Sequence, residues 1–263
     1  MNRNSSYSKN QKKLSNENYQ EEGFIAGKNA VLEALKSDMP LDTVFISGNQ
    51  GVLHQISELA KERGIPVKTV TDSKLSQMTG NAVHQGTAAT GAYGNYVSIE
   101  KILETAKEKG EPPFIIICDE IQDPHNLGAI IRTAEAAGVH GISIPKRRSA
   151  SLNLTIGKTS AGAASWVQVA RVPNLVSAMK TLQENGVWIY GTDASGSDYT
   201  KIDFTGATAI VIGSEGEGMR RLTAETCDAM LKLPMYGKIN SLNASVAGGI
   251  FMYEVVRQRN TKK

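Results

Sequence analysis

The chain has 263 residues, of which 29 are basic and 26 acidic, and 40% of its side chains are hydrophobic. This composition is that of a globular chain long enough for one large domain or two small ones, and its net charge of +3 permits a nucleic-acid partner without requiring one. No run of residues approaches the ~18 apolar residues of a membrane span, and the N-terminus lacks the apolar core of a secretory signal.

The first 22 residues predict a disordered arm. Met1 and Leu14 are their only aliphatic side chains, so the segment cannot bury enough surface to offset its conformational entropy. From 23 to 97, short helical and strand patterns alternate, which predicts a compact α/β domain. Helices are predicted over 29–36 and 52–63, and strands over 43–47, 65–70 and 85–93.

Residues 98–263 predict a second, larger α/β domain. Its apolar strand patterns lie at 114–118, 141–144, 167–172, 187–191, 209–212 and 231–233. Helical spacing is found over 127–137, 174–185 and 244–257. Continuous apolar strands separated by amphipathic helices predict a mostly parallel sheet covered on both faces. Ligands of such sheets bind beyond the carboxyl ends of the strands, and the unusual residues of this chain gather at those ends.

The first of these end loops, 119–138, follows an apolar strand directly. Asn126 is predicted to cap a helix whose apolar stripe begins at Leu127. Arg132 points away from that stripe. Two interpretations are open for it, an ion pair with Glu135 on a solvated face or a part in the chemistry of a site.

Two further loops also follow predicted strands. Residues 213–218 interleave three glycines with polar side chains, among them Glu215, which predicts either a tight turn or a backbone that lies close to a ligand. The loop before the last helix carries Ser241 and Asn243, and either could be a plain helix N-cap. The glycine pair at 248–249 costs that helix about 1 kcal/mol per residue relative to alanine, which predicts close packing against another backbone.

The spacing of cysteines and histidines argues against a metal site. The four histidines are scattered, and neither Cys-x-x-Cys nor His-Glu-x-x-His occurs. No G-x-G-x-x-G follows a strand, so a dinucleotide site of the Rossmann kind is not expected. Two cysteines, Cys118 and Cys227, exclude a disulfide scaffold and favour a reducing cytoplasm.

Taken together, the three loops form an ordered set of motifs: N-x5-R at 126–132, I-G-S-E-G-x-G at 212–218 and L-P-M-x-G-x-x-x-S-L-N-A-S at 233–245. This set resembles the SpoU/TrmH family, RNA ribose 2′-O-methyltransferases of the SPOUT class. The resemblance extends from about residue 22 to 259. It includes a small domain similar to the L30e-like substrate-binding domain of the family, with G-K-N-A-V-L-E-A-L at 27–35 and H-Q-G-x-A-A at 84–89. The layout is most similar to the branch that methylates a guanosine ribose in bacterial 23S rRNA.

The resemblance implies a fold, a cofactor and an assembly. The implied fold is α/β, with an L30e-like domain over 23–97 and a SPOUT-type parallel sheet over 98–263 whose C-terminal segment forms a trefoil knot. S-adenosylmethionine is the implied methyl donor, held by the knot loops at positions that match Gly191, Thr192, Asp193, Gly213, Leu233 and Leu242. Members of this layout are homodimers, and the last helix, with its glycine pair, Val246, Ile250 and Phe251, is implied to be part of the contact.

The implied catalytic residues are Arg132, Asn126, Glu215, Ser241 and Asn243. A sulfonium methyl group is already activated, so the reaction needs alignment of the ribose and removal of the hydroxyl proton, and no metal. The pKa of a guanidinium, above about 12, makes Arg132 a poor base. We expect Arg132 to bind a substrate phosphate and stabilise developing charge, with Asn126 and Glu215 holding it and the nucleotide in place. Ser241 and Asn243 would shape the final loop, and His125 is an alternative base because histidine is a common general base in enzymes.

The expected partner is RNA. Basic residues at 146–148 and Lys158 could contact RNA phosphates, or they could form a solvated loop. Ribosomal RNA is favoured because many tRNA-type relatives have basic terminal extensions in place of a separate small domain. The alternatives are a tRNA methyltransferase of the same family, an enzyme acting on antibiotic-site rRNA, and a non-catalytic RNA-binding module. We expect a cytoplasmic protein with neither a membrane nor a metal partner.

Overall fold

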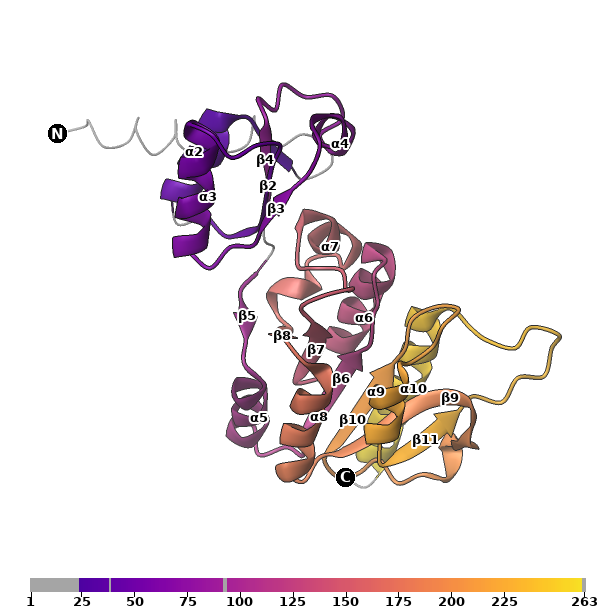
Figure 1. Cartoon of the computed structure of the whole chain (residues 1–263). Helices are drawn as coiled ribbons and strands as arrows, with labels where there is room; N and C mark the ends of the chain where they lie inside the picture. The colour runs from indigo at the N-terminus through magenta and orange to yellow at the C-terminus, as the bar shows by residue number, and fades with distance from the viewer. Residues whose placement is uncertain (1–23, 38, 92–93, 262–263) are drawn as a thin grey trace. The chain divides into compact units, whose positions relative to one another are not determined.

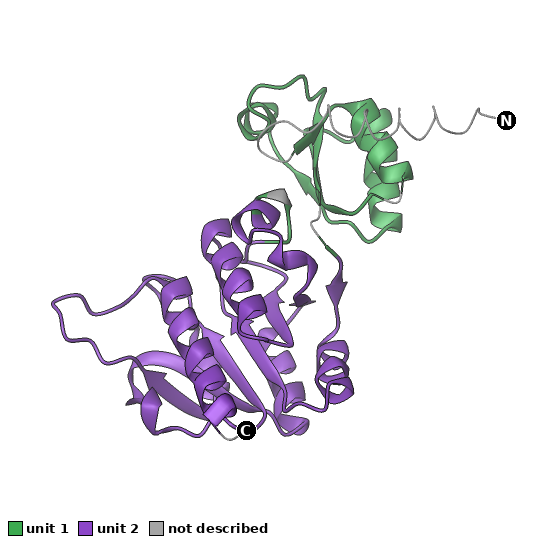
Figure 2. Ribbon diagram, turned by 180° about the vertical axis from the view of Figure 1, so that it is seen from behind, with its two compact units in different colours: residues 1–94, 151–155 green, residues 95–150, 156–263 purple. Residues whose placement is uncertain are grey.

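The computed structural model describes residues 24–37, 39–91 and 94–261, apart from the side chain of residue 154. Within these ranges the chain divides into two compact units, which Figure 2 colours separately. The first unit holds residues up to 94 together with 151–155, and the second holds the remainder. The sequence placed this boundary at 97/98 and gave no sign that 151–155 packs with the first unit. The predicted arm, 1–22, lies outside the described residues.

The first unit is built on a four-stranded sheet. The strand order is β1 (Phe24–Ala26), β4 (Thr87–Gly91), β2 (Leu41–Ile46) and β3 (Val67–Thr69). Strand β4 is antiparallel to both of its neighbours, whereas β2 and β3 are parallel. The helices are α2 (Lys28–Lys36), α3 (Val52–Glu62) and α4 (Asp72–Met78).

The core of the first unit explains which helices the sequence could predict. Val31 of α2 and Ile56 of α3 are fully buried against the sheet, and they belong to the apolar spacings that predicted both helices. Helix α4 was not predicted. Its seven residues bury only Leu75, too few apolar positions for a helical stripe, and it begins instead at a capping bond from the Lys74 backbone N–H to the Thr71 hydroxyl at 3.2 Å.

The second unit is built on a seven-stranded sheet in the order β11-β9-β10-β6-β7-β8-β5, in which every pairing is parallel. This confirms the α/β class with a parallel sheet. All residues of the central strands are buried, which is why continuous apolar runs predicted these strands to within one residue. The strands are β5 (Tyr96–Val97), β6 (Phe114–Cys118), β7 (Gly141–Pro145), β8 (Gln168–Val172), β9 (Trp188–Asp198), β10 (Thr208–Ile212) and β11 (Ala229–Lys232).

Helices cover both faces of this sheet, as Figure 1 shows. The first face carries α5 (Ile99–Glu108) and α8 (Leu175–Glu184), with α9 (Arg221–Thr226) packed on α8. The opposite face carries α6 (Pro124–Ala136) and α10 (Ala244–Thr261), which pack on each other. Helix α7 (Leu154–Thr159) and short 3-10 turns at Ala163–Ser165 and Tyr199–Lys201 complete the unit. No helix in the described ranges is long and apolar enough to cross a membrane.

The glycine pair of α10 permits close packing, but against side chains rather than the backbone that the sequence predicted. A Cβ at Gly248 would lie 2.5 Å from Cδ1 of Ile212 in β10. A Cβ at Gly249 would make an ordinary contact with the methyl group of Thr133 in α6, at 3.6 Å. Gly248 therefore sets how closely α10 lies on the sheet.

Strand β9 is longer than its predicted range of 187–191. Gly191 pairs with Met230 of β11, and the next residue of β11, Leu231, pairs with Ser197. Residues 192–196 therefore bulge out of the ladder. The chain can return at Gly196 because a Cβ there would lie 2.6 Å from the backbone of Leu231. The polar sequence of the bulge gives no strand pattern, so the sequence did not predict it.

The strand order places a topological switch between β6 and β10. From β6 the chain runs outward through β7 and β8, and it then returns to build β9 and β10 on the other side of β6. The loops after β6 and β10 meet here, with the Asp119 N–H donating to the Ile212 carbonyl at 2.9 Å. Ligands of open parallel sheets bind at such a point.

Arg259, near the end of α10, binds that helix to the segments that precede β6 and β10, at the amino ends of these strands. Its guanidinium donates to the carbonyls of Pro112 at 2.9 Å, Pro113 at 3.1 Å and Gly206 at 2.7 Å, and it lies over the Phe114 ring at 5.2 Å. Burial lowers the pKa of Arg259 from its usual value. The end of α10 is therefore fixed to the segments from which β6 and β10 start.

Candidate functional site

Helix α6 begins three residues earlier than predicted, which frees Asn126. The N-cap is Asp123, whose carboxylate accepts from the His125 N–H at 3.0 Å, and Pro124 is the first helical residue. Asn126, predicted as the cap, lies within the first turn, and only 8% of it is exposed. Because Asp123 satisfies the helix terminus, the side chain of Asn126 is available to residues from other loops.

Asn243 brings the three motif loops together. Its Nδ2 donates to Asn126 Oδ1 at 2.8 Å and to Glu215 Oε1 at 2.5 Å. The backbone N–H of Ala244 donates to the same Glu215 oxygen at 3.3 Å. Asn126, Glu215 and Asn243, which we name the amide cluster, therefore meet although Asn243 lies 117 residues after Asn126 in the chain.

The second half of the Asn243 side chain caps α10. Its Oδ1 accepts from the backbone N–H groups of Ser245 at 3.0 Å and Val246 at 3.2 Å. The prediction that Asn243 is a helix cap is therefore confirmed for its oxygen, while its nitrogen belongs to the amide cluster. The two sets of bonds fix the orientation of its amide.

The glycine loop after β10 is a closed turn that presents Glu215. Ser214 and Gly218 exchange two backbone hydrogen bonds, each of 3.0 Å, and Gly216 and Gly218 have φ angles of 84° and 69°. A Cβ at Gly213 would lie 2.5 Å from the Gly218–Met219 backbone, so only glycine allows the loop to fold back. Glu215 lies on this turn, and its Oε2 has no partner among the described residues.

Three predicted residues lie outside the amide cluster. Arg132 is exposed, six residues beyond Asn126 on α6, and its guanidinium has no partner in the described part of the chain. The alternative ion pair with Glu135 is therefore not formed. Ser241 and the His125 ring are also exposed and form no hydrogen bond with the amide cluster.

The predicted cofactor positions lie within β9 at 191–193, after β10 at Gly213, after β11 at Leu233 and before α10 at Leu242. Thr192 lies level with the end of β10, where its hydroxyl donates to the Val211 carbonyl at 2.9 Å. Leu233 follows β11 and is half-buried, and Leu242, directly before Asn243, is 40% exposed. Together with Gly213 after β10, these residues lie at the carboxyl edge of the β11-β9-β10 strands.

Two of the predicted cofactor positions are occupied by contacts within the protein. A Cβ at Gly191 would lie 2.6 Å from the sulfur of Met230, so this glycine serves the packing of β9. The Asp193 carboxylate accepts from the hydroxyl of Ser195 at 2.5 Å and from its backbone N–H at 2.8 Å. These bonds lower the pKa of Asp193 and close the start of the bulge on itself.

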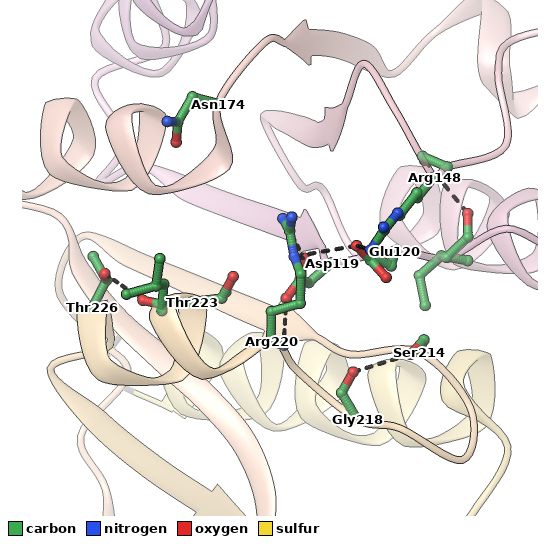
Figure 3. Close-up of polar contacts among 12 residues, drawn as sticks. Asp119, Glu120, Arg148, Asn174, Ser214, Gly218, Arg220, Thr223 and Thr226 are labelled. Carbon is green, nitrogen blue, oxygen red and sulfur yellow. Dashed lines mark hydrogen bonds and ion pairs between the residues drawn. The ribbon is translucent and has the colours of Figure 1, made fainter.

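A second polar group at this edge was not predicted from the sequence. The fully buried Asp119 carboxylate accepts from Arg220 at its backbone N–H (2.8 Å), at Nε (2.9 Å) and at Nη2 (2.8 Å) (Figure 3). Glu120 lies 3.4 Å from both Arg220 Nε and Arg148 Nη1. We name these four residues the Asp119 network. Asp119 and Glu120 directly follow an apolar strand, and this pattern could have predicted a polar group at the strand end. Their partner Arg220, 101 residues after Asp119, could not have been predicted.

The described ranges contain no group of three His, Cys, Asp or Glu side chains arranged to hold a metal ion. Both cysteines are free thiols. Burial is the main cause that raises the pKa of Cys118, and likewise that of Cys227, to about 12. Both thiols are therefore protonated at neutral pH and are poor nucleophiles.

Polar loops that converge at the switch of a parallel sheet define an α/β protein with a ligand site at that edge. A model of the SpoU rRNA Methylase family matches residues 113–253, and a model of RNA 2′-O ribose methyltransferase substrate binding matches 24–96. The chain belongs to the SpoU family of S-adenosylmethionine-dependent RNA methyltransferases, which confirms the resemblance.

Relatives along the whole chain agree with this assignment. The chain is 49% identical over 244 residues to Bacillus subtilis (strain 168) YacO, named as a TrmH family tRNA/rRNA methyltransferase, with 92% of this chain and 98% of that protein covered. A similarly named Staphylococcus aureus (strain MSSA476) protein is 44% identical over 245 residues, covering 91% and 98%. Among solved structures, the SpoU methyltransferase AviRb from Streptomyces viridochromogenes with bound AdoMet has a TM-score of 0.59 at 23% identity, covering 90% of each chain.

Proposed function

We propose that this enzyme transfers a methyl group from S-adenosylmethionine to the ribose 2′-hydroxyl of a guanosine in 23S rRNA. The observation that carries the proposal is the amide cluster, which joins three motif loops at the carboxyl edge of the sheet. Glu215 is exposed, and its Oε2 is an acceptor with no partner among the described residues. It would hold a hydroxyl or amino hydrogen of the target nucleotide.

Arg132 would bind the phosphate of the target nucleotide. Its guanidinium is exposed and unpaired among the described residues, so no internal ion pair has to be broken when a phosphate arrives. Bound in this way, Arg132 would orient the ribose and stabilise the negative charge that develops on its oxygen. The cofactor supplies a methyl group activated by its sulfonium centre. Ser241 would complete the loop before α10.

The residues of the β11-β9-β10 edge fit S-adenosylmethionine. Turns and strand ends at Thr192, Asp193 and Gly213 offer backbone donors and acceptors, and Leu233 and Leu242 offer partly exposed apolar surface for an adenine ring. Gly191 would act indirectly, by keeping β9 close to Met230. The trefoil knot that the family resemblance implies remains a prediction.

The first unit favours ribosomal RNA over tRNA. The solved structure of an A. aeolicus TrmH/SpoU tRNA modifying enzyme is 30% identical to this chain, with a TM-score of 0.53, and covers 62% of this chain. A Sinorhizobium meliloti rRNA methyltransferase with bound AdoMet covers 89% of this chain at 24% identity and a TM-score of 0.56. The match to the rRNA enzyme is therefore too long to be confined to the second unit, whereas the match to the tRNA enzyme is not. An RNA substrate and two free thiols also favour the cytoplasm.

The enzyme would act as a homodimer through α10. Val246, Ile250 and Tyr253 form a stripe on this helix and are 52%, 38% and 52% exposed. Phe251, which was grouped with this surface at first, is only 2% exposed and belongs to the interior instead. Light scattering on the purified chain should give twice the mass of 28.3 kDa. A mass of one chain at micromolar concentration would exclude this assembly.

Methyl transfer to defined RNAs tests the proposal. Labelled S-adenosylmethionine would be supplied with 23S rRNA or with bulk tRNA, both lacking ribose methylation, and Arg132→Ala would be the control enzyme. Label mapped to one guanosine ribose of 23S rRNA is the expected result. Label in tRNA would keep the reaction and change the substrate. Binding of RNA without label in either substrate, and without heat on mixing with S-adenosylmethionine, would leave only an RNA-binding module.

A further inference from the structure

A cleft lined by arginines lies beside the Asp119 network. It has a volume of about 730 Å³ and lies where β7, β8 and the loop before α9 end. Four arginines line it, and Glu120 is the only acidic residue among the lining side chains. We name it the arginine cleft; its charged lining residues are Glu120, Arg147, Arg148, Arg220 and Arg221.

The arginine cleft is separate from the amide cluster. Both lie at the carboxyl edge, but the cleft is bordered by α8 and α9 on one face of the sheet, whereas the amide cluster lies with α6 and α10 on the other. Arg220 lines the cleft, is separated from the turn that carries Glu215 by Met219, and is held by Asp119 at the switch point.

Arg220 is held in one orientation before any ligand binds. Its Nε, Nη2 and backbone N–H are bound to the buried Asp119, and its Nη1 has no partner among the described residues. A guanidinium fixed in this way keeps donors for an anion while losing little side-chain freedom on binding.

Two lining residues adopt a costly backbone conformation. Glu120 has a φ of 58° and Arg148 a φ of 55°, although neither is a glycine. They contact each other through an ion pair of 3.4 Å in which the Arg148 side chain is 73% exposed. The Glu120 side chain is only 8% exposed, but solvent screens the Arg148 end of the pair, so the pair returns little stability. Left-handed residues that packing does not require are typical of ligand sites, which supports a role in binding for Arg148.

We propose that the arginine cleft binds successive backbone phosphates of the RNA strand on one side of the target nucleotide. This inference rests on the proposed function and adds to it the path of the substrate. Arginine forks match phosphate oxygens. S-adenosylmethionine carries a sulfonium charge and no phosphate, so four arginines do not suit it. No aromatic side chain lines the cleft among the described residues, so it reads the backbone rather than stacked bases.

The test compares two variants that remove two positive charges each. Arg147→Gln with Arg148→Asn removes charges from the cleft, and asparagine tolerates the left-handed backbone at 148. Glu120 keeps Arg220 as its partner in this variant. The control, Lys107→Gln with Lys180→Gln, removes two exposed charges from α5 and α8 outside the cleft.

Binding of single-stranded RNA and S-adenosylmethionine would be measured for the wild-type enzyme and both variants across a range of salt concentrations. We expect the cleft variant to bind RNA roughly ten-fold more weakly, with a salt dependence of log K smaller by about 1.4, or about 0.7 for each lost phosphate contact. Its affinity for S-adenosylmethionine should not change, and the control should match the wild type.

If RNA affinity fell equally in the cleft and control variants, or fell in neither, the cleft proposal would be overturned. Methyl transfer by the wild-type enzyme would still uphold the proposed function in that case. Full displacement of RNA by inorganic phosphate at constant ionic strength would show a single anion site and would also overturn it. Wild-type RNA binding that depends on the cleft, without methyl transfer to any RNA, would support the cleft and contradict the proposed function.

Discussion

The two polar groups at the carboxyl edge of the second unit are held in different ways. The Asp119 network is organised around a carboxylate with no exposed surface, which three donors of one arginine satisfy. The amide cluster uses one buried asparagine and two exposed residues, joined by neutral and singly charged hydrogen bonds. Burial ties the first group to stability, whereas exposure keeps the second available to a substrate.

The largest expected effect is on catalysis. Arg132→Ala should lower methyl transfer by about a thousand-fold, because it would remove the cation that we propose stabilises the transition state. The free energy of unfolding should change by less than about 0.5 kcal/mol, since this side chain is exposed and has no partner among the described residues. Transfer kinetics and urea unfolding check both. Loss of S-adenosylmethionine affinity or of folding would instead give Arg132 a structural role.

Substitutions of Asn243 can separate its cap on α10 from its hydrogen bond to Glu215. Asn243→Ala should lower transfer about a hundred-fold and cost about 1 kcal/mol of stability, because the cap of α10 is lost. Asn243→Ser should restore stability, since serine caps as well as asparagine, without restoring transfer. If serine restored both, the bond to Glu215 would have no function in the reaction.

Arg220 and Arg221 are neighbours in the chain, but Arg220 pairs with a buried carboxylate and Arg221 with an exposed one. Arg220→Ala should cost about 2 kcal/mol, because it leaves Asp119 buried with fewer donors, although the half-exposed position of Arg220 moderates the loss. Arg221→Ala breaks only an exposed pair with Glu225 and should cost less than about 0.5 kcal/mol. Urea unfolding measures the difference. Similar values for both would show that Asp119 is satisfied without Arg220.

The smallest expected effect is a loss of stability at acidic pH. It should arise from His140, which belongs neither to the Asp119 network nor to the amide cluster. Burial, together with the positive charge of Lys109, lowers the pKa of His140, whose Nδ1 accepts from the Phe114 N–H at 3.0 Å. Because the unfolded chain then takes up this proton more readily, stability should be complete above pH ~6.5 and fall below it, by at most about 1.4 kcal/mol per pH unit. His140→Asn should flatten unfolding curves measured between pH 5 and 7. An unchanged slope would assign the acid sensitivity to another group.

The sequence predicted the sheet of the second unit well because its strands are buried on both faces and carry continuous apolar runs. It missed the bulge of β9 and helix α4, where polar residues leave no periodic signal. The motif resemblance named all three members of the amide cluster. The helical pattern misplaced the cap of α6, since Asp123 and Asn126 are equally good capping residues. Asp119 and Arg220 could not be paired from sequence, because only the switch in strand order brings them together.

The contacts of Arg259 with the segments before β6 and β10 have a consequence for synthesis of the chain. Pro113 precedes Arg259 by 146 residues, and the contact between them holds the last helix against the start of the central strand. On a translating ribosome, β6 emerges long before the residue that secures it. The sheet of the first unit, in contrast, has all its strands once Gly91 is made. The sheet of the first unit can therefore form early in elongation, whereas the second unit acquires its closing contacts only late in synthesis.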